Sequence, residues 1–144
     1  MLVSILPVFE LRGAIPLGLT VYNLSPLSVF YWAVLGNIIP VVFLLLLLGP
    51  LSSYLSGKSY FFNRFFEWLF VRTRRKHGPR FEVWGTLALI SFVAIPLPMT
   101  GGWTGAVAAF VFGVPFRKAL PLIFIGVIIA GLVVTLATLG VLAI

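Results

Sequence analysis

The sequence lacks cysteine and has little charge. With no cysteine among 144 residues, disulfides, thiolate chemistry and cysteine-ligated metals are excluded. Only 9% of the residues are charged, against about a quarter in an ordinary soluble domain. Three acidic residues and one histidine do not supply a zinc site or a two-carboxylate hydrolase site within one subunit. We therefore expect no bound metal, no cofactor and no enzymatic activity.

Long apolar stretches are abundant instead, since 61% of the residues are hydrophobic. Residues 24–57 and 119–144 contain no charge. Each stretch can supply the roughly 20 apolar residues that cross a hydrocarbon core about 30 Å thick. The sequence predicts an all-α integral membrane protein, a single membrane domain over residues 1–144, with transmembrane helices over 26–49 and 116–143.

A basic connector lies between the two predicted spans. Residues 58–82 carry seven basic side chains and two glutamates, a net charge of +5 out of +7 for the whole chain. Such a run between spans follows the positive-inside rule, so we expect residues 58–82 in the cytoplasm of a multi-pass cell-membrane protein and both termini outside. Aromatic residues alternate with the charges, which predicts an interfacial amphipathic helix over 58–79 and no nucleic-acid partner. Four of its residues are expected to contact anionic lipid head groups: Arg72, Arg74, Arg75 and Lys76.

Two further apolar stretches are too short to cross the membrane. Residues 83–97 and 103–114 flank the segment Pro98–Gly102, and about a dozen helical residues rise only about 18 Å. We predict a re-entrant hairpin over 83–113, although a single span kinked at its prolines is an alternative. Non-helical backbone at this depth must be buried in protein or line a wet cavity. The turn is therefore a candidate site.

The first 22 residues follow the same plan. Glu10, Arg12, Gly13 and Pro16 interrupt an otherwise apolar segment, which predicts a second re-entrant hairpin over residues 1–22. A hairpin returns to its starting side and the following span crosses once, so the second half of the chain begins on the opposite side. We therefore expect an inverted repeat of hairpin plus transmembrane helix, an architecture that places transporter sites near the midplane.

The two turns also carry family motifs. FELRGAIPLG at residues 9–18 and IPLPMTGGWTGA at residues 95–106 resemble the paired signatures of the small multidrug export protein family, and the likeness covers nearly the whole chain. That family in turn resembles the DedA, or VTT-domain, membrane proteins. The resemblance implies paired re-entrant hairpins and translocation of a lipid or solute. DedA proteins place an arginine in the second hairpin, whereas Arg12 lies in the first.

The charged residues of the first turn are the leading candidates for a site. Ionisable side chains at membrane depth are costly, so a functional role is the default hypothesis. Glu10 could bind and release a proton, while a salt bridge between Glu10 and Arg12 that closes the turn is the structural alternative.

The uncharged candidates lie in both turns. Gly13 and the pair Gly101–Gly102 are expected to start the returning helices, whose N-termini favour an anionic group. Pro16 shapes the break, Thr100 caps a helix or binds ligand, and Trp103 stacks on substrate or packs between the hairpins. Asn37 and Thr104 are secondary polar candidates.

Together these features predict a transporter or lipid translocase, coupled to protons, that moves an amphiphilic anion such as a lipid phosphate through a midplane site. Two alternatives remain: an exporter of cationic drug-like compounds, and a non-transporting scaffold that binds anionic lipid. The expected partners are the lipid bilayer, the substrate, protons and a second copy of the chain, because two spans and two hairpins leave much polar surface to cover.

Overall fold

The computed structural model describes residues 1–58, 64, 67–68, 79–95, 100–112 and 114–144. Within these residues the regular elements are helices and none is a strand, which confirms the all-α prediction. The helices, in chain order, are α1 (Leu2–Ile5), α2 (Glu10–Thr20), α3 (Pro26–Lys58), α5 (Pro79–Ala94), α6 (Gly102–Val111) and α7 (Phe116–Leu142).

Two long helices form the frame of the molecule. The apolar span Pro26–Leu51 of α3 has a mean hydropathy of 2.4, and α7 reaches 2.8. At 1.5 Å per residue each span rises about 40 Å, enough to cross a membrane. Only 28% of each span is buried inside the protein, so most of its apolar surface is left to face lipid. The two predicted membrane-crossing helices are therefore present.

Helix α3 is longer than predicted. The sequence placed its end at residue 49, before Pro50, but the helix continues to Lys58 with Pro40 and Pro50 inside it. A proline removes one backbone hydrogen bond, and membrane helices tolerate this loss because neighbouring groups can pair the freed carbonyl.

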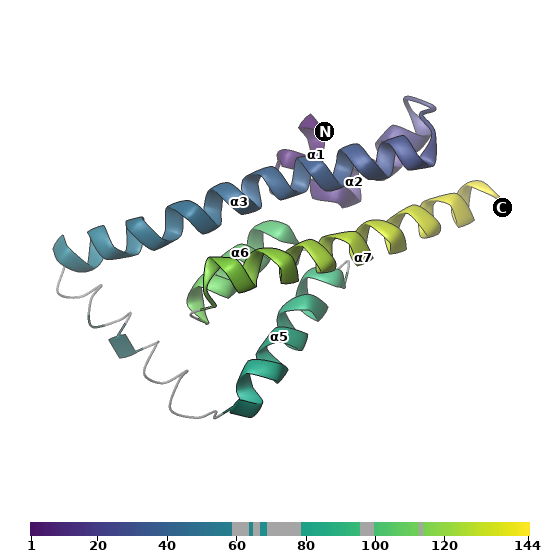
Figure 1. The fold of residues 1–144 in the computed structure, drawn as a ribbon. Coiled ribbons are helices and arrows are strands. Elements are labelled where there is room, and N and C mark those ends of the chain that lie inside the picture. Colours follow the sequence, from purple (N-terminus) through teal and green to yellow (C-terminus); the bar gives the residue numbers. More distant parts are fainter. Residues whose placement is uncertain (59–63, 65–66, 69–78, 96–99, 113) are drawn as a thin grey trace.

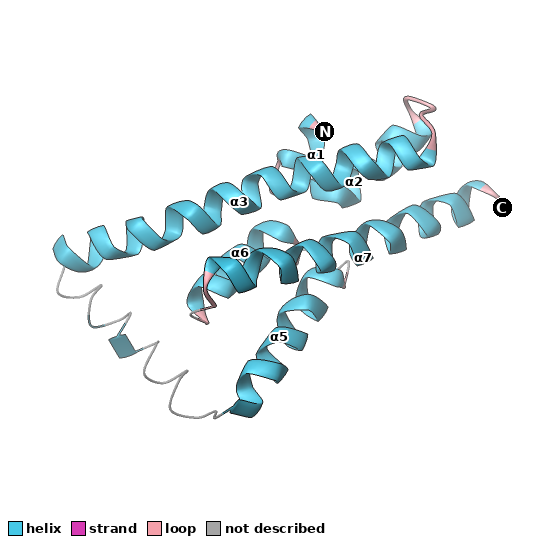
Figure 2. Ribbon diagram, viewed as in Figure 1, coloured by secondary structure: helices cyan, strands magenta, loops and turns pink. Residues whose placement is uncertain are grey.

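The long helices run side by side in opposite directions (Figure 1). Helices α2 and α6 each contact both of them, and α5 lies against α7. Figure 2 shows that the described loops are short and lie at the ends of the helices. The arrangement brings the start of α2 and the start of α6 together beside the middle of α3.

Residues at the ends of the short helices explain where they stop. Helix α1 ends at Ile5, and the next residue, Leu6, is extended (ψ 132°). Leu6 precedes Pro7, and the helical conformation is disfavoured for a residue before proline. Helices α2 and α6 have 11 and 10 residues, which rise about 16 and 15 Å. Each is long enough to reach the middle of a membrane and too short to cross it.

The N-terminal arm differs from expectation. The predicted hairpin over residues 1–22 has unequal arms, because α1 has only four residues. Its first residue, Met1, lies against Gly36 in the middle of the apolar span of α3. The structure thus places Met1 at the depth of the span rather than at its outer end.

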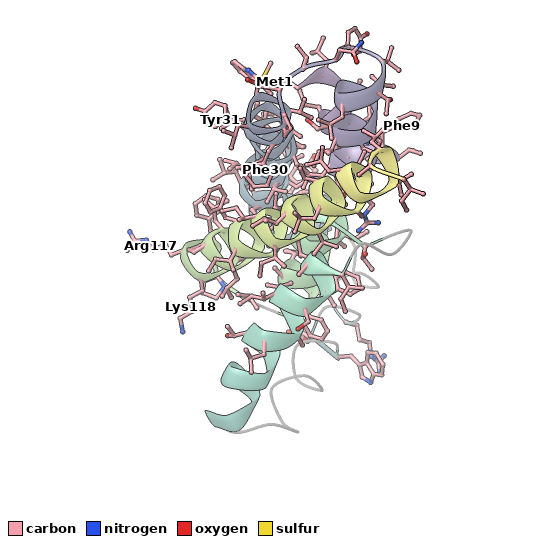
Figure 3. The ribbon with its side chains drawn as sticks, turned by 90° about the vertical axis from the view of Figure 1, so that its right-hand side faces the viewer. Met1, Phe9, Phe30, Tyr31, Arg117 and Lys118 are labelled. Atoms are coloured by element: carbon pink, nitrogen blue, oxygen red, sulfur yellow. The ribbon has the colours of Figure 1, made fainter. Side chains whose placement is uncertain are left out.

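Glycines let the helices approach closely. Ser4 and the Met1 carbonyl sit where a side chain at Gly36 would lie, and Val93 of α5 occupies the corresponding place at Gly126 of α7. The ring of Phe30, labelled in Figure 3, fills the space at Gly131, so α3 and α7 are joined there. The small residues of α7 therefore serve contacts within the chain.

The basic connector is mostly outside the described residues. The predicted interfacial helix over 58–79 and its four lipid-contacting residues, Arg72, Arg74, Arg75 and Lys76, fall there. Two other basic residues are visible: Arg117 and Lys118 are exposed at the start of α7 and point away from the bundle (Figure 3).

We predict that Gly126→Ala destabilises the protein by roughly 1–3 kcal/mol, because the added methyl group would lie 2.7 Å from Val93 Cβ and 3.1 Å from the Ile90 carbonyl oxygen. Thermal unfolding in detergent measures the effect. Gly140→Ala, on the same helix with nothing within 4 Å, is the matched control and should change stability by less than about 0.5 kcal/mol. Equal unfolding temperatures for the two variants would contradict the packing assigned to α5 and α7.

Candidate functional site

The break between α5 and α6 is the starting point of the site. Helix α5 ends at Ala94 and α6 begins at Gly102. Gly101 has φ 151° and ψ −164°, a conformation that essentially only glycine adopts. The sequence prediction that a helix starts at Gly101 and Gly102 is confirmed. Such a break leaves carbonyl groups free at the end of α5 and amide groups free at the start of α6.

Glu10 pairs with the start of α6. Its carboxylate accepts a hydrogen bond from the Trp103 backbone amide (N to Oε1, 3.4 Å) and another from the Gly102 amide. Only 6% of Glu10 is exposed. A side chain at Gly101 would collide with Oε2, so the missing Cβ is what admits the carboxylate. A negative charge at a helix N-terminus is stabilising because the free amides and the helix dipole point toward it.

Arg12 pairs with the end of α5. Its Nη2 donates to the Ile95 carbonyl oxygen at 3.3 Å and to Thr100 Oγ1 at 2.8 Å. Thr100 Oγ1 in turn donates to the same Ile95 carbonyl at 2.7 Å. A positive charge belongs at a helix C-terminus for the same electrostatic reason. Thr100 thus links Arg12 to the break and does not cap α6 with its hydroxyl.

Glu10 and Arg12 therefore engage opposite ends of one broken helix. The two residues are two positions apart in the first turn of α2, so they point in different directions. Glu10 itself has φ 42°, a left-handed conformation that costs a non-glycine residue about 1–2 kcal/mol. Such strain persists where the surroundings enforce it, and here the contact with α6 does so.

Asn37 completes the site from α3. It is 1% exposed, and its side-chain amide hydrogen-bonds the Glu10 carboxylate. Its Oδ1 atom is buried without a hydrogen-bond partner. A cavity of about 10 Å³ opens here, far below the roughly 300–1,000 Å³ of drug-sized sites. Its lining residues are Glu10, Leu11, Arg12, Asn37, Val93, Gly101, Gly102, Val127 and Ala130.

The aromatic and hydroxyl candidates on α6 make structural contacts. Trp103 Nε1 donates to the Ile5 carbonyl at 3.1 Å, which ties the end of α1 to α6. Thr104 Oγ1 donates to the Gly101 carbonyl at 3.3 Å. Trp103 thus reaches the site through its backbone amide, while its ring joins the two interrupted segments.

Two sequence candidates lie away from the cavity. Gly13 was predicted to start the returning helix, but α2 begins three residues earlier, at Glu10. A side chain added at Gly13 would lie 3.0 Å from Phe9, so the glycine makes room for that ring. Pro16 sits inside α2, where Thr20 Oγ1 donates to its carbonyl at 2.7 Å. The turn is therefore set by Pro7 and Glu10.

The sequence did not point to the apolar wall. Val93 of α5 and Val127 and Ala130 of α7 line the cavity, and the two valines are fully buried. In a chain this rich in aliphatic residues, nothing distinguishes these from their lipid-facing neighbours.

Within the described residues, no group of three histidine, cysteine or acidic side chains could hold a metal ion. The polar groups of the site are the Glu10 carboxylate, the Arg12 guanidinium, the Asn37 amide and the backbone amides at the start of α6.

Comparison with known proteins gives one match. A family model described as "Putative small multi-drug export protein" matches residues 10–133. Neither the curated proteins nor the solved structures contain a match. The matched range begins at Glu10 and includes both turns, so the site lies inside the region that the family shares.

We predict that Gly101→Ala destabilises the protein by about 2 kcal/mol or more, because the methyl group strains the backbone and displaces the Glu10 carboxylate from α6. Thermal unfolding in detergent again provides the measurement. Gly85→Ala on α5, where nothing lies within 4 Å, is the matched control and should unfold near the native temperature. A native unfolding temperature for Gly101→Ala would show that the Glu10 contact contributes nothing to stability.

Proposed function

The chain belongs to the small multi-drug export protein family, and from that premise we propose a transporter whose site lies between Glu10 of α2 and the broken helix α5–α6. The family and the two apolar helices make it a membrane protein of the transport class. The observation that carries the finer proposal is that buried Glu10 and half-buried Arg12 pair with opposite ends of one helix break.

The proposed topology is an inverted repeat of two re-entrant hairpins and two spans. Three observations support it: α3 and α7 run in opposite directions, α2 and α6 are half-length helices, and a short helix packs on a glycine in each long helix, Gly36 and Gly126. With the connector 58–82 in the cytoplasm, exposed Arg117 and Lys118 at the start of α7 lie on the same side. The broken ends then meet near the midplane, where secondary transporters bind substrate.

We propose that protonation of Glu10 opens the site. An ionised carboxylate holds the start of α6, while a neutral carboxyl loses most of its attraction to the helix dipole. The α6 amides then no longer face a negative charge, and the site keeps the positive charge of Arg12. Neither α3 before Lys58, nor α6, nor α7 after Lys118 contains an ionisable acid or base apart from tyrosine, and the charged residues of α5, Arg80 and Glu82, lie in its first turn, at the end away from Val93. One proton thus raises the net charge of the site by one.

The substrate class that fits the protonated site is an amphiphilic anion. An anionic group, such as a lipid phosphate, would take the place of the Glu10 carboxylate at the α6 amides and approach Arg12. The walls formed by Val93, Val127 and Ala130 suit an apolar portion of the same molecule. Because the cavity is small in this conformation, we assign the structure to a closed state in which Glu10 occupies the anion position.

A cationic drug-like substrate is the second candidate. Two observations favour it. Glu10 supplies a carboxylate to the site, and the family description refers to multi-drug export. A lipophilic cation would bind ionised Glu10 and leave when the carboxylate is protonated. A scaffold that carries no substrate is the third candidate, in which the charges only hold the break together.

We predict that Glu10→Gln lowers transport of substrate in reconstituted vesicles by about tenfold or more and abolishes its pH dependence, because the amide neither titrates nor caps α6 with a charge. Transport rates across a pH series measure both effects. Glu67→Gln, which changes an exposed carboxylate, is the matched control and should behave as the native protein. Native rates and native pH dependence in both Glu10→Gln and Arg12→Ala would overturn the role of the pair.

The two substrate classes predict opposite effects of pH. Anion binding requires protonated Glu10, so affinity for a phospholipid or polyprenyl phosphate rises as pH falls. Cation binding requires ionised Glu10, so affinity for a lipophilic cation falls as pH falls. Binding of one probe of each class to the native protein between pH 5 and pH 9, roughly the range over which a perturbed carboxyl titrates, distinguishes them. A protein that binds neither probe and transports neither is the scaffold.

A further inference from the structure

Asn37 presents a polar atom that the rest of the structure does not satisfy. Its Oδ1 is buried without a donor, at the edge of the cavity beside Glu10. An unpaired buried acceptor costs about 1–3 kcal/mol, so its presence at a site with a titratable neighbour needs an explanation. The side chain cannot reach solvent, because only 1% of the residue is exposed.

The missing donor has the chemistry of a protonated carboxyl group. Ionised Glu10 only accepts hydrogen bonds, and the groups around it only donate: the amides of Gly102 and Trp103 and the side-chain amide of Asn37. Protonated Glu10 would carry an O–H group that needs an acceptor. Arg12 cannot accept, and of the side chains that line the cavity Asn37 is the one with a free acceptor atom.

We propose that Asn37 is the proton-sensing partner of Glu10, donating from Nδ2 while the carboxylate is ionised and accepting at Oδ1 once it is protonated. The change needs a rotation of the amide about its own side chain and no movement of α3. The proton stays on a Glu10 oxygen throughout, so no bond other than a hydrogen bond forms or breaks.

Two features of the surroundings favour this rotation. Oδ1 lies against Gly102, where a side chain would collide with it, and Asn37 and Glu10 line the same cavity. The charged groups on the elements around Glu10 are Arg12 of its own helix, the amino group of Met1, whose carbonyl lies against Gly36, and Arg80 and Glu82 at the end of α5 away from Val93; α3, α6 and α7 present none at this point. The hydrogen-bond partner, rather than a second charge, therefore determines how well the protonated form is held. This inference rests on the proposed role of Glu10 as the proton-binding group.

Two substitutions of Asn37 should raise the pH of half-maximal transport to different extents. Asn37→Leu removes both the donor to the ionised Glu10 carboxylate and the acceptor for its proton, and because the bond to the charged form is the stronger one, that pH should rise by less than about one unit. Asn37→Asp creates two carboxyl groups that share one proton, so that pH should rise further. Thr138→Val, which removes a hydroxyl that bonds only within α7, is the matched control and should leave the profile unchanged.

Infrared spectroscopy provides a readout independent of transport. The carbonyl stretch of protonated Glu10, identified as the band missing from Glu10→Gln, should shift to higher wavenumber in Asn37→Leu because its hydrogen bond is lost. Asn37→Asp keeps the size of the side chain, so it tests the inference even if Asn37→Leu fails to fold.

The outcomes separate the two proposals. If Glu10→Gln abolishes the pH dependence while neither Asn37 variant moves the profile or the infrared band, the role of Asn37 is wrong and that of Glu10 stands. An unchanged infrared band in Asn37→Leu would show that Asn37 does not accept the Glu10 proton and would also overturn the inference. If Glu10→Gln itself keeps the native pH dependence, the proposed function fails.

Discussion

Backbone groups cannot be left unpaired in a hydrocarbon medium, and the break between α5 and α6 exposes such groups at both of its ends. Glu10 and Arg12 meet this constraint together. The negative charge of Glu10 lies at the free amides that start α6, and the positive charge of Arg12 lies at the free carbonyls that end α5. Both come from the first turn of α2. The positions of α2, α5 and α6 therefore depend on one pair of charges, and the close packing around Gly101 follows from it.

In the proposed transporter, the same contact connects stability to function. A carboxylate that caps a helix loses that role when it takes up a proton, so the group that holds the break closed can also release it. Asn37 is proposed to bind both forms of Glu10. Its Nδ2 donates to the ionised carboxylate, and after a rotation of the side-chain amide its Oδ1 accepts from the protonated carboxyl. A purely structural clamp would have no use for a buried acceptor without a donor, and the unpartnered Oδ1 is the feature that favours a working site.

Small residues determine how closely the remaining helices approach. Gly36 and Gly126 lie at comparable places in α3 and α7, and each receives a neighbouring short segment where a side chain would stand. Large aliphatic and aromatic side chains lie mainly on the outside of the long helices, as expected where lipid is the solvent. The interior is built mostly from alanine, glycine and valine, with a few leucines and isoleucines such as Ile15 and Ile123, and the polar cluster lies among them.

The sequence by itself determined the membrane class, two helices long and apolar enough to span, and the break at Gly101–Gly102, and it singled out Glu10 and Arg12 as candidates, because hydropathy, glycine and charge are local signals. It ended the first span at residue 49, whereas α3 continues to Lys58, and it expected Gly13 to start a helix that begins at Glu10. Only the tertiary structure decided that Glu10 meets the start of α6, that Arg12 meets the end of α5, and that Asn37 and the valine wall join them. Glu10 and Trp103 are 93 positions apart, and local patterns carry no information about such contacts.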